Sequence, residues 1–298
     1  VIFAKQILLL LGTDPKVMHL SVPYVQWMLA GSPLLFVYII YTSILRGVGD
    51  SLTPLIVLSL TSLMGVVITP VLIAGYFGFP RLGIIAPAIA TILGYLAVLI
   101  FLVIYLNKKD HPLKLDWHLF RQIRHQPHLS KVILRLGIPT GLQMVTTSMA
   151  GLVIVGLVNR HGAEATAAYG AVNQVLNYIQ FPALSIAIAA SIFAAQAIGA
   201  GKAELLAKVT RTALGMNLVI TGILVSLGYL FSKYLMALFI TDPAVVVLGQ
   251  QLLFIVLWAI VFFGASAIFA SIMRASGTVT VPMIINILAI VLIEVPCA

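Results

Sequence analysis

Charged side chains are scarce in this sequence. Only 8% of the 298 residues are Asp, Glu, Lys or Arg, against about 25% in an average soluble domain. The chain is 61% hydrophobic, with a mean hydropathy of +1.14, and has too few polar side chains to cover a globule. We therefore expect an integral membrane protein whose main partner is the lipid bilayer. This composition excludes a soluble enzyme, a nucleic-acid-binding protein and a disordered tail.

Cysteine is also nearly absent. The single Cys297 excludes a disulfide framework and a cysteine-based metal cluster. The chain has no P-loop and no H-E-x-x-H motif, and Gly47-x-Gly49-Asp50 lacks the second membrane aspartate of an intramembrane protease. We predict no catalytic residue, no metal site, no organic cofactor and no obligate protein partner. The chain starts at Val1 without a signal peptide, so we expect a piece of a longer protein.

Long apolar stretches recur along the chain, separated by short breaks. Each has at least the roughly 20 residues that a membrane helix needs, and so is longer than the 9–11 residues of a barrel strand. The sequence predicts an all-α polytopic membrane protein. Its eight transmembrane helices are expected near 18–45, 52–75, 83–106, 136–158, 166–198, 212–231, 246–273 and 279–298.

The positive charges are unevenly distributed between these breaks. Twelve of the seventeen Lys and Arg residues fall in the breaks near 46–51, 107–135, 199–211 and 274–278, which share one side of the membrane. The other five lie on the opposite side. Because basic residues concentrate in cytoplasmic loops, we predict that segment 107–135 is cytoplasmic.

An internal repeat is the most informative pattern. Thr13-Asp14-Pro15 recurs as Thr241-Asp242-Pro243, an offset of 228 residues, and the same offset relates some fifty positions without a gap. Six spans separate the copies, so both face the same way, which predicts two parallel-repeat helical lobes. We assign 1–106 to the first lobe with three spans, 107–135 to an inter-lobe linker, and 136–298 to the second lobe with five spans.

Several short motifs resemble those of the multidrug and toxic compound extrusion (MATE) family. They are Arg46-Gly47-Val48-Gly49-Asp50 followed by Pro54, the helix start at 82–91, Gly137-Ile138-Pro139, and the helix end at 196–202. The resemblance covers about helices 4–11 of 12. It implies a cation-coupled antiporter of the bacterial plasma (inner) membrane that exports small amphipathic organic compounds, which are often cationic. The coupling ion would be H⁺ or Na⁺.

The turns that follow the two copies of the repeat are candidate functional elements. Arg46, Gly49 and Asp50 form the first of them, and Arg274 and Gly277 occupy matching positions in the second. One interpretation is a tight interhelical turn, with glycines permitting positive φ and Asp50 capping the next helix. The other interpretation is a cytoplasmic gate in which Arg46 and Arg274 are equivalent.

Polar residues inside the spans are the remaining candidates. Glu294 lies about fifteen residues into the last span, where a carboxylate is costly and is a functional hypothesis by default. We consider it the candidate for the coupling ion. The alternatives are a structural salt bridge or hydrogen bond within the bundle, or exposure caused by an early end of the helix. Uncharged residues that either line a wet cavity or join helices are Gln143, Thr147, Asn173, Asn177 and Gln180. By the resemblance, Thr147 stands where many relatives carry an acidic residue.

Two other functions remain open at this stage. A related flippase for lipid-linked saccharides would need basic residues inside the spans to hold a pyrophosphate, and the spans contain almost none. A membrane assembly protein without transport activity is the second alternative.

Overall fold

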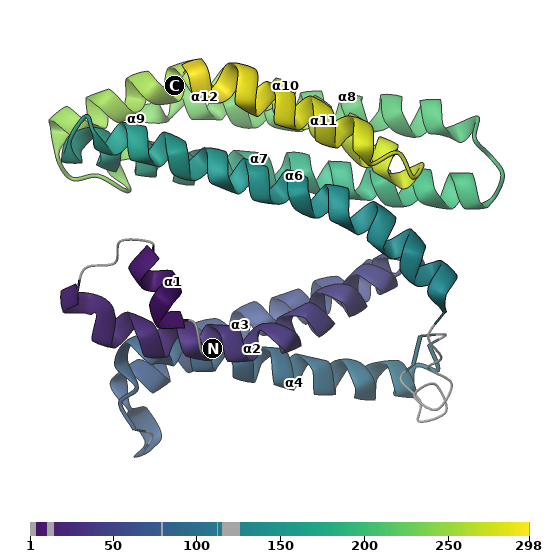
Figure 1. Ribbon diagram of the computed structural model, residues 1–298, viewed down its shortest axis with the longest axis horizontal. Helices are drawn as coiled ribbons and strands as arrows, with labels where there is room; N and C mark the ends of the chain where they lie inside the picture. The colour runs from purple at the N-terminus through teal and green to yellow at the C-terminus, as the bar shows by residue number, and fades with distance from the viewer. Residues whose placement is uncertain (1–3, 11–14, 79, 112, 115–125, 298) are drawn as a thin grey trace. The chain divides into compact units, whose positions relative to one another are not determined.

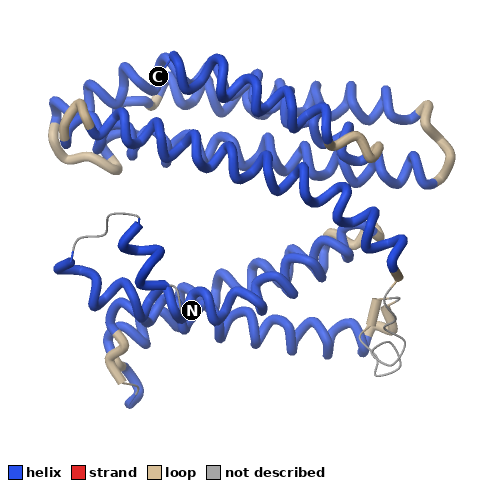
Figure 2. Tube along the Cα trace, viewed as in Figure 1, coloured by secondary structure: helices blue, strands red, loops and turns tan. Residues whose placement is uncertain are grey.

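The computed structural model describes residues 4–10, 15–78, 80–111, 113–114 and 126–297. In this part of the chain the backbone forms helices and loops and no strand, as Figure 2 shows. The all-α prediction is therefore confirmed. The chain divides into two compact units, Val1–Arg124 and His125–Ala298, and the division falls inside segment 107–135.

Eight helices in the described residues are long and apolar enough to cross a membrane, as the hydropathy predicts. They are Met18–Gly47, Leu52–Ala74, Gly83–Lys108, Pro127–Asn159, Ala163–Gly199, Leu205–Leu230, Pro243–Ala275 and Thr280–Cys297. Several boundaries differ from the prediction, and the start of the fourth span differs most. The fourth of these helices begins at Pro127 and not near 136, so the end of the predicted linker is helical. Hydropathy misses these first turns because Lys131 and Arg135 make them polar.

In the described part of the first unit the α-helices are α1 (Ala4–Leu10), α2 (Pro15–Gly47), α3 (Leu52–Ala74) and α4 (Ala86–Lys108), as Figure 1 shows. Two short 3₁₀ turns, Tyr76–Gly78 and Gly83–Ile85, connect α3 to α4. Helix α3 ends because Gly75 adopts the left-handed conformation (φ +73°), which a glycine accepts without steric cost. Helix α4 packs against both α2 and α3. The buried side chains between them are Leu45, Val57, Val98, Leu102 and Leu106.

The second unit begins with α6 (Pro127–Asn159), α7 (Ala163–Gly199) and α8 (Leu205–Leu230). It continues with the short α9 (Ser232–Ala237), α10 (Pro243–Ala275), α11 (Thr280–Ala289), a π-helical turn at Ile290–Glu294, and α12 (Val295–Cys297). Helices α7, α8 and α10 pack on one another, and α6 pairs with α11. Small residues on the buried face of α7 allow this close packing; they include Ala168, Ala171, Ala183, Ala187, Ala190 and Ala194.

One close contact fixes how α8 crosses α10. The Asn217 side chain of α8 is only 2% exposed, and its Oδ1 has no hydrogen-bond partner in the described residues. It lies directly against Gly264 of α10, where an added Cβ would approach Oδ1 to 2.2 Å. A side chain at position 264 would require Asn217 to move, since that distance is far inside van der Waals contact.

The repeat is visible in the backbone of each unit taken by itself. Helices α2 and α10 both have 33 residues, and their bounds differ by the 228-residue offset at each end. Helices α3 and α11 begin at Leu52 and Thr280, at the same offset. Thr13 and Asp14 of the repeated tripeptide lie outside the described residues. Superposition of the lobes about the membrane normal stays a prediction.

Candidate functional site

The turn between α2 and α3 is held by its own side chains. The Arg46 guanidinium donates to Ser43 Oγ at 3.2 Å, and the Gly49 amide donates to the Arg46 carbonyl at 3.0 Å. Gly49 has φ +93°, a conformation that favours glycine. Asp50 Oδ1 accepts from the Thr53 amide at 3.0 Å, and Oδ2 accepts from the Thr53 hydroxyl at 2.5 Å. Asp50 therefore caps the first turn of α3.

The second turn repeats this geometry without the carboxylate. Arg274 donates to Ser271 Oγ at 3.0 Å, and the Gly277 amide donates to the Arg274 carbonyl at 3.0 Å. Gly277 has φ +83°. The residue at the position of Asp50 is Thr278, so the backbone turn forms in both copies whichever residue stands there.

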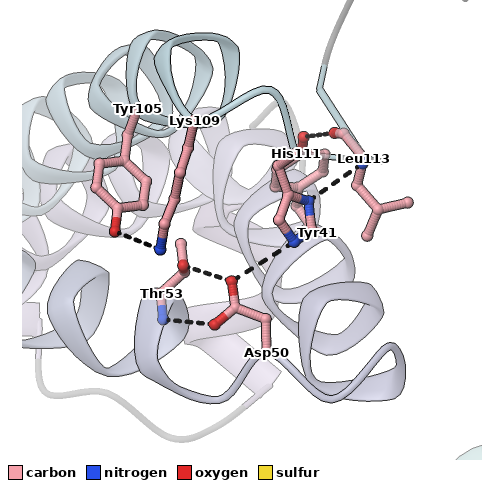
Figure 3. Close-up of polar contacts among 7 residues, drawn as sticks. All are labelled: Tyr41, Asp50, Thr53, Tyr105, Lys109, His111 and Leu113. Atoms are coloured by element: carbon pink, nitrogen blue, oxygen red, sulfur yellow. Dashed lines mark hydrogen bonds and ion pairs between the residues drawn. The ribbon is translucent and has the colours of Figure 1, made fainter.

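Asp50 also meets a residue far along the chain, as Figure 3 shows. His111 Nε2 lies 3.7 Å from Asp50 Oδ2, and the Leu113 amide donates to His111 Nδ1 at 3.1 Å. The Tyr41 hydroxyl donates to the Leu113 carbonyl at 2.5 Å. These contacts fold the segment after α4 onto the end of α2. We call residues 109–111 and 113–114 the linker anchor.

The surroundings of Asp50 favour its ionised form. Partial burial raises the pKa of this carboxyl, but the hydrogen bonds from Thr53 and the charges of His111 and Lys109 outweigh it. The pKa of Asp50 therefore lies below its ordinary value. Lys109 is in turn held by Tyr105, whose hydroxyl accepts from Nζ at 3.2 Å and whose ring centroid lies 5.2 Å from it.

Arg46 borders a cavity of about 360 Å³ between α2 and α3, which Tyr38, Thr42 and Pro54 also line. A place in the wall of this cavity is compatible with both interpretations of Arg46, a turn-forming residue and a gate residue. The structure brings Arg46, Gly49 and Asp50 together in one turn, and Arg274 and Gly277 in the other.

Glu294 is the last residue of the π-helical turn Ile290–Glu294. Its side chain is exposed, and no ion pair to it occurs among the described residues. The turn has a local cause, because Pro296 has no amide hydrogen to donate to the carbonyl of Leu292, four residues earlier. The Val295 amide instead bonds the Ile290 carbonyl, five residues back. Single π turns of this kind are frequent at functional sites.

The predicted cavity residues fall into two groups. Thr147 Oγ1 donates to Asn286 Oδ1 at 3.2 Å, joining α6 to α11 near Gln143, whose carbonyl also accepts from Thr147. Asn286 was not recognised from the sequence, since one asparagine in an apolar helix has no distinctive pattern.

The amide stripe of α7, formed by Asn173, Asn177 and Gln180, takes no part in this contact between α6 and α11. Asn173 and Gln180 are half-buried and Asn177 is exposed, whereas Val172, Val175, Leu176 and Ile179 beside them are buried against α8 and α10. The stripe therefore lies off the packed face of α7. Within the described residues no hydrogen bond joins it to Gln143 or Thr147.

Comparison with known proteins decides the family. The sequence matches the MatE family over residues 1–71 and 139–298. The chain belongs to the MatE family. It is 42% identical over 297 residues to the probable multidrug resistance protein YoeA of Bacillus subtilis, covering 100% of this chain and 64% of that protein. It is 27% identical over 297 residues to an FAD transporter of Shewanella oneidensis, covering 100% of this chain and 65% of that protein.

Solved MATE structures share the fold. One described as the outward-facing conformation of a multidrug resistance MATE family transporter has a TM-score of 0.88 at 20% identity, covering 99% of this chain and 65% of that one. This MATE chain thus spans about two thirds of the length of the relatives that it matches. The family consists of transporters and not of enzymes. Together with the eight apolar helices, it identifies an integral protein of the bacterial plasma (inner) membrane.

Proposed function

We propose that this MATE chain works as a cation-coupled antiporter that exports small amphipathic organic compounds by alternating access. The observation that carries the proposal is the match to the MatE family over most of the chain, together with the 42% identity to a relative named as a multidrug resistance protein. In this mechanism two similar lobes rock about a site between them, which opens to either side of the membrane in turn.

The proposed coupling ion is H⁺ or Na⁺, and its proposed site is Glu294. A carboxylate within a membrane span is energetically costly. Such a residue is therefore usually either paired with another group or part of a functional site. Glu294 has no ion-pair partner in the described residues, and it terminates a π-helical turn. The turn also leaves the backbone next to Pro296 without a regular helical hydrogen bond, and such carbonyls are suitable ligands for a cation.

The proposed wall for the organic substrate is the amide stripe of α7. Asn173, Asn177 and Gln180 lie outside the packed face of the helix, and polar groups in a membrane span need either protein or water beside them. A wall of neutral amides beside apolar side chains suits amphipathic compounds, because it offers hydrogen bonds without selecting one charge pattern.

The test is substrate efflux from vesicles that contain the protein, driven by an imposed proton or sodium gradient, with Glu294→Gln. Glutamine keeps the size and hydrogen bonding of the side chain but cannot titrate. We expect gradient-driven efflux of a fluorescent organic cation to fall at least about tenfold, a typical size for the loss of one coupling interaction. Efflux that remains is expected to lose its response to external pH or Na⁺.

Glu164→Gln is the matched control, because Glu164 lies in the first turn of α7 and outside the proposed site. It should keep both the rate and the ion response. Full-rate, ion-dependent efflux by well-folded Glu294→Gln would contradict the coupling role. Absence of transport in the parent protein under every gradient would contradict the antiporter proposal and favour an assembly protein.

A further inference from the structure

The linker anchor is held to the first unit by backbone hydrogen bonds and by apolar packing. Its backbone continues the end of α4, with the Lys109 amide bonded to the Tyr105 carbonyl and the His111 amide to the Leu106 carbonyl. Leu113 packs at the edge of the hydrophobic cluster around Leu45 and Leu102. All of these contacts lie within Val1–Arg124, at the point where the chain leaves this unit.

His111 is central to the linker anchor, and its hydrogen bonds fix its tautomer. Because the Leu113 amide donates to Nδ1, this nitrogen carries a lone pair and no proton. In the neutral ring the proton therefore sits on Nε2, which faces Asp50 Oδ2 at 3.7 Å. Nδ1 thus accepts a hydrogen bond from within the linker anchor, and Nε2 is directed at the α2–α3 turn.

Protonation would change these two contacts in opposite directions. A second proton can be added only at Nδ1, where it would replace the lone pair that accepts from Leu113. The positive charge would strengthen the attraction to Asp50. The ring would stay at the turn while Leu113 lost its acceptor, and with it the support for the carbonyl that Tyr41 bonds.

We propose that the linker anchor is a pH-responsive device: neutral His111 fastens the segment leaving α4 to the α2–α3 turn, and protonated His111 releases it at Leu113. Histidine suits this role because it is the side chain that ordinarily changes charge between about pH 5 and 8. The device responds to the pH on the side of the membrane that holds segment 107–135.

Each element packed around His111 contributes titratable or charged groups. Helix α2 contributes Tyr41, the turn contributes Asp50, and the end of α4 contributes Tyr105 and Lys109. Within the anchor, Asp110 and Lys114 pair with each other at 2.5 Å, and this pair lowers the pKa of the Asp110 carboxyl. Among the described residues, Asp50 is the acidic group that pairs with the ring, and its lowered pKa keeps it ionised above its ordinary value of 3.8.

Hydrogen–deuterium exchange of the peptide that contains Leu113 tests the proposal, with the intact protein in detergent or nanodiscs between about pH 8 and about pH 5.5. After correction for the intrinsic pH dependence of exchange, we expect the Leu113 amide to exchange about fivefold to tenfold faster at the acidic end, as the loss of one hydrogen bond implies. His111→Phe should exchange at the fast rate at every pH. The control His161→Phe, in a loop of the second unit, should behave like the parent.

Asp50→Asn separates the switch from a merely structural role. Asparagine keeps a capping oxygen for Thr53 but removes the charge that stabilises the imidazolium. The acid transition should then move to lower pH by about half a unit, as expected for one partly exposed ion pair. Protection of Leu113 that does not change with pH, or an unchanged acid response in His111→Phe, would overturn the proposal. An Asp50→Asn transition at the parental pH would overturn the part assigned to Asp50.

Discussion

Helices α2 and α10 are two copies of one sequence unit, yet only one of them is enclosed. On α10, Leu257 and Ile268 are fully buried by α7 and α8. The corresponding residues of α2, Leu29 and Ile40, are 37% and 58% exposed. The helix bounds and the following turn are the same, so the local sequence sets the backbone and the neighbouring helices set the burial.

The largest expected effect concerns a position at which the two copies differ in side-chain size. Gly264 of α10 corresponds to Phe36 of α2, whose side chain is 61% exposed. Gly264→Val should destabilise the second unit by about 3 kcal/mol, because its Cβ would clash with Asn217. Denaturation by increasing SDS concentration would measure the loss. Gly215→Val, at an exposed position of α8 with open space around it, is the control and should change stability little.

We expect the same glycine substitution to cost the same free energy of unfolding in both turns, because the two glycines have similar backbone conformations. Gly49→Ala and Gly277→Ala each force a side chain into the left-handed region, at a cost of about 1–2 kcal/mol. Around Gly277 there is open space, so the strained φ alone sets the cost. Thermal unfolding of the two variants should give matching losses. Losses that differ by more than about twofold would show that the turns are not equivalent in energy.

The smallest expected effect on stability concerns Asp50, the charged residue that the first turn has and the second turn lacks. Asp50→Ala should lose about 1 kcal/mol at neutral pH by removing the cap of α3, whereas Thr278→Ala should change stability by less than about 0.5 kcal/mol. The pKa of Asp50 is lowered in the folded protein, so its contribution is present above its ordinary value of 3.8 and is lost as pH falls below it. Stability measured at about pH 7 and about pH 3 should show the Asp50→Ala difference shrinking in acid. A difference that is constant with pH would contradict this.

Much of the fold could be predicted because the bilayer imposes it. Hydropathy located eight spans, and the 228-residue offset anticipated that Gly49 and Gly277 occupy equivalent turns. Contacts across the sequence could not be predicted. His111 lies 61 residues beyond Asp50, in a polar segment with no periodicity, so nothing local indicates that they meet.

Two local features were missed for different reasons. The start of α6 lies outside the apolar stretch, where hydropathy has no signal. The π-helical turn at Ile290–Glu294 depends on backbone hydrogen bonding after Pro296 removes a donor, and the residue pattern alone does not distinguish it from a simple kink. The roles of Glu294, the α7 stripe and the two arginines stay predictions.

The missing side chain at Gly264 also limits how α8 and α10 can move. Residues one turn away on the same face of α10 are Ile260 and Ile268, both buried. Sliding α10 along α8 by a turn of about 5.4 Å would bring one of these branched side chains onto Asn217, where even a Cβ does not fit. Sliding of the pair would therefore require Asn217 to move. Because α7 packs against both helices, we expect the three helices to move together.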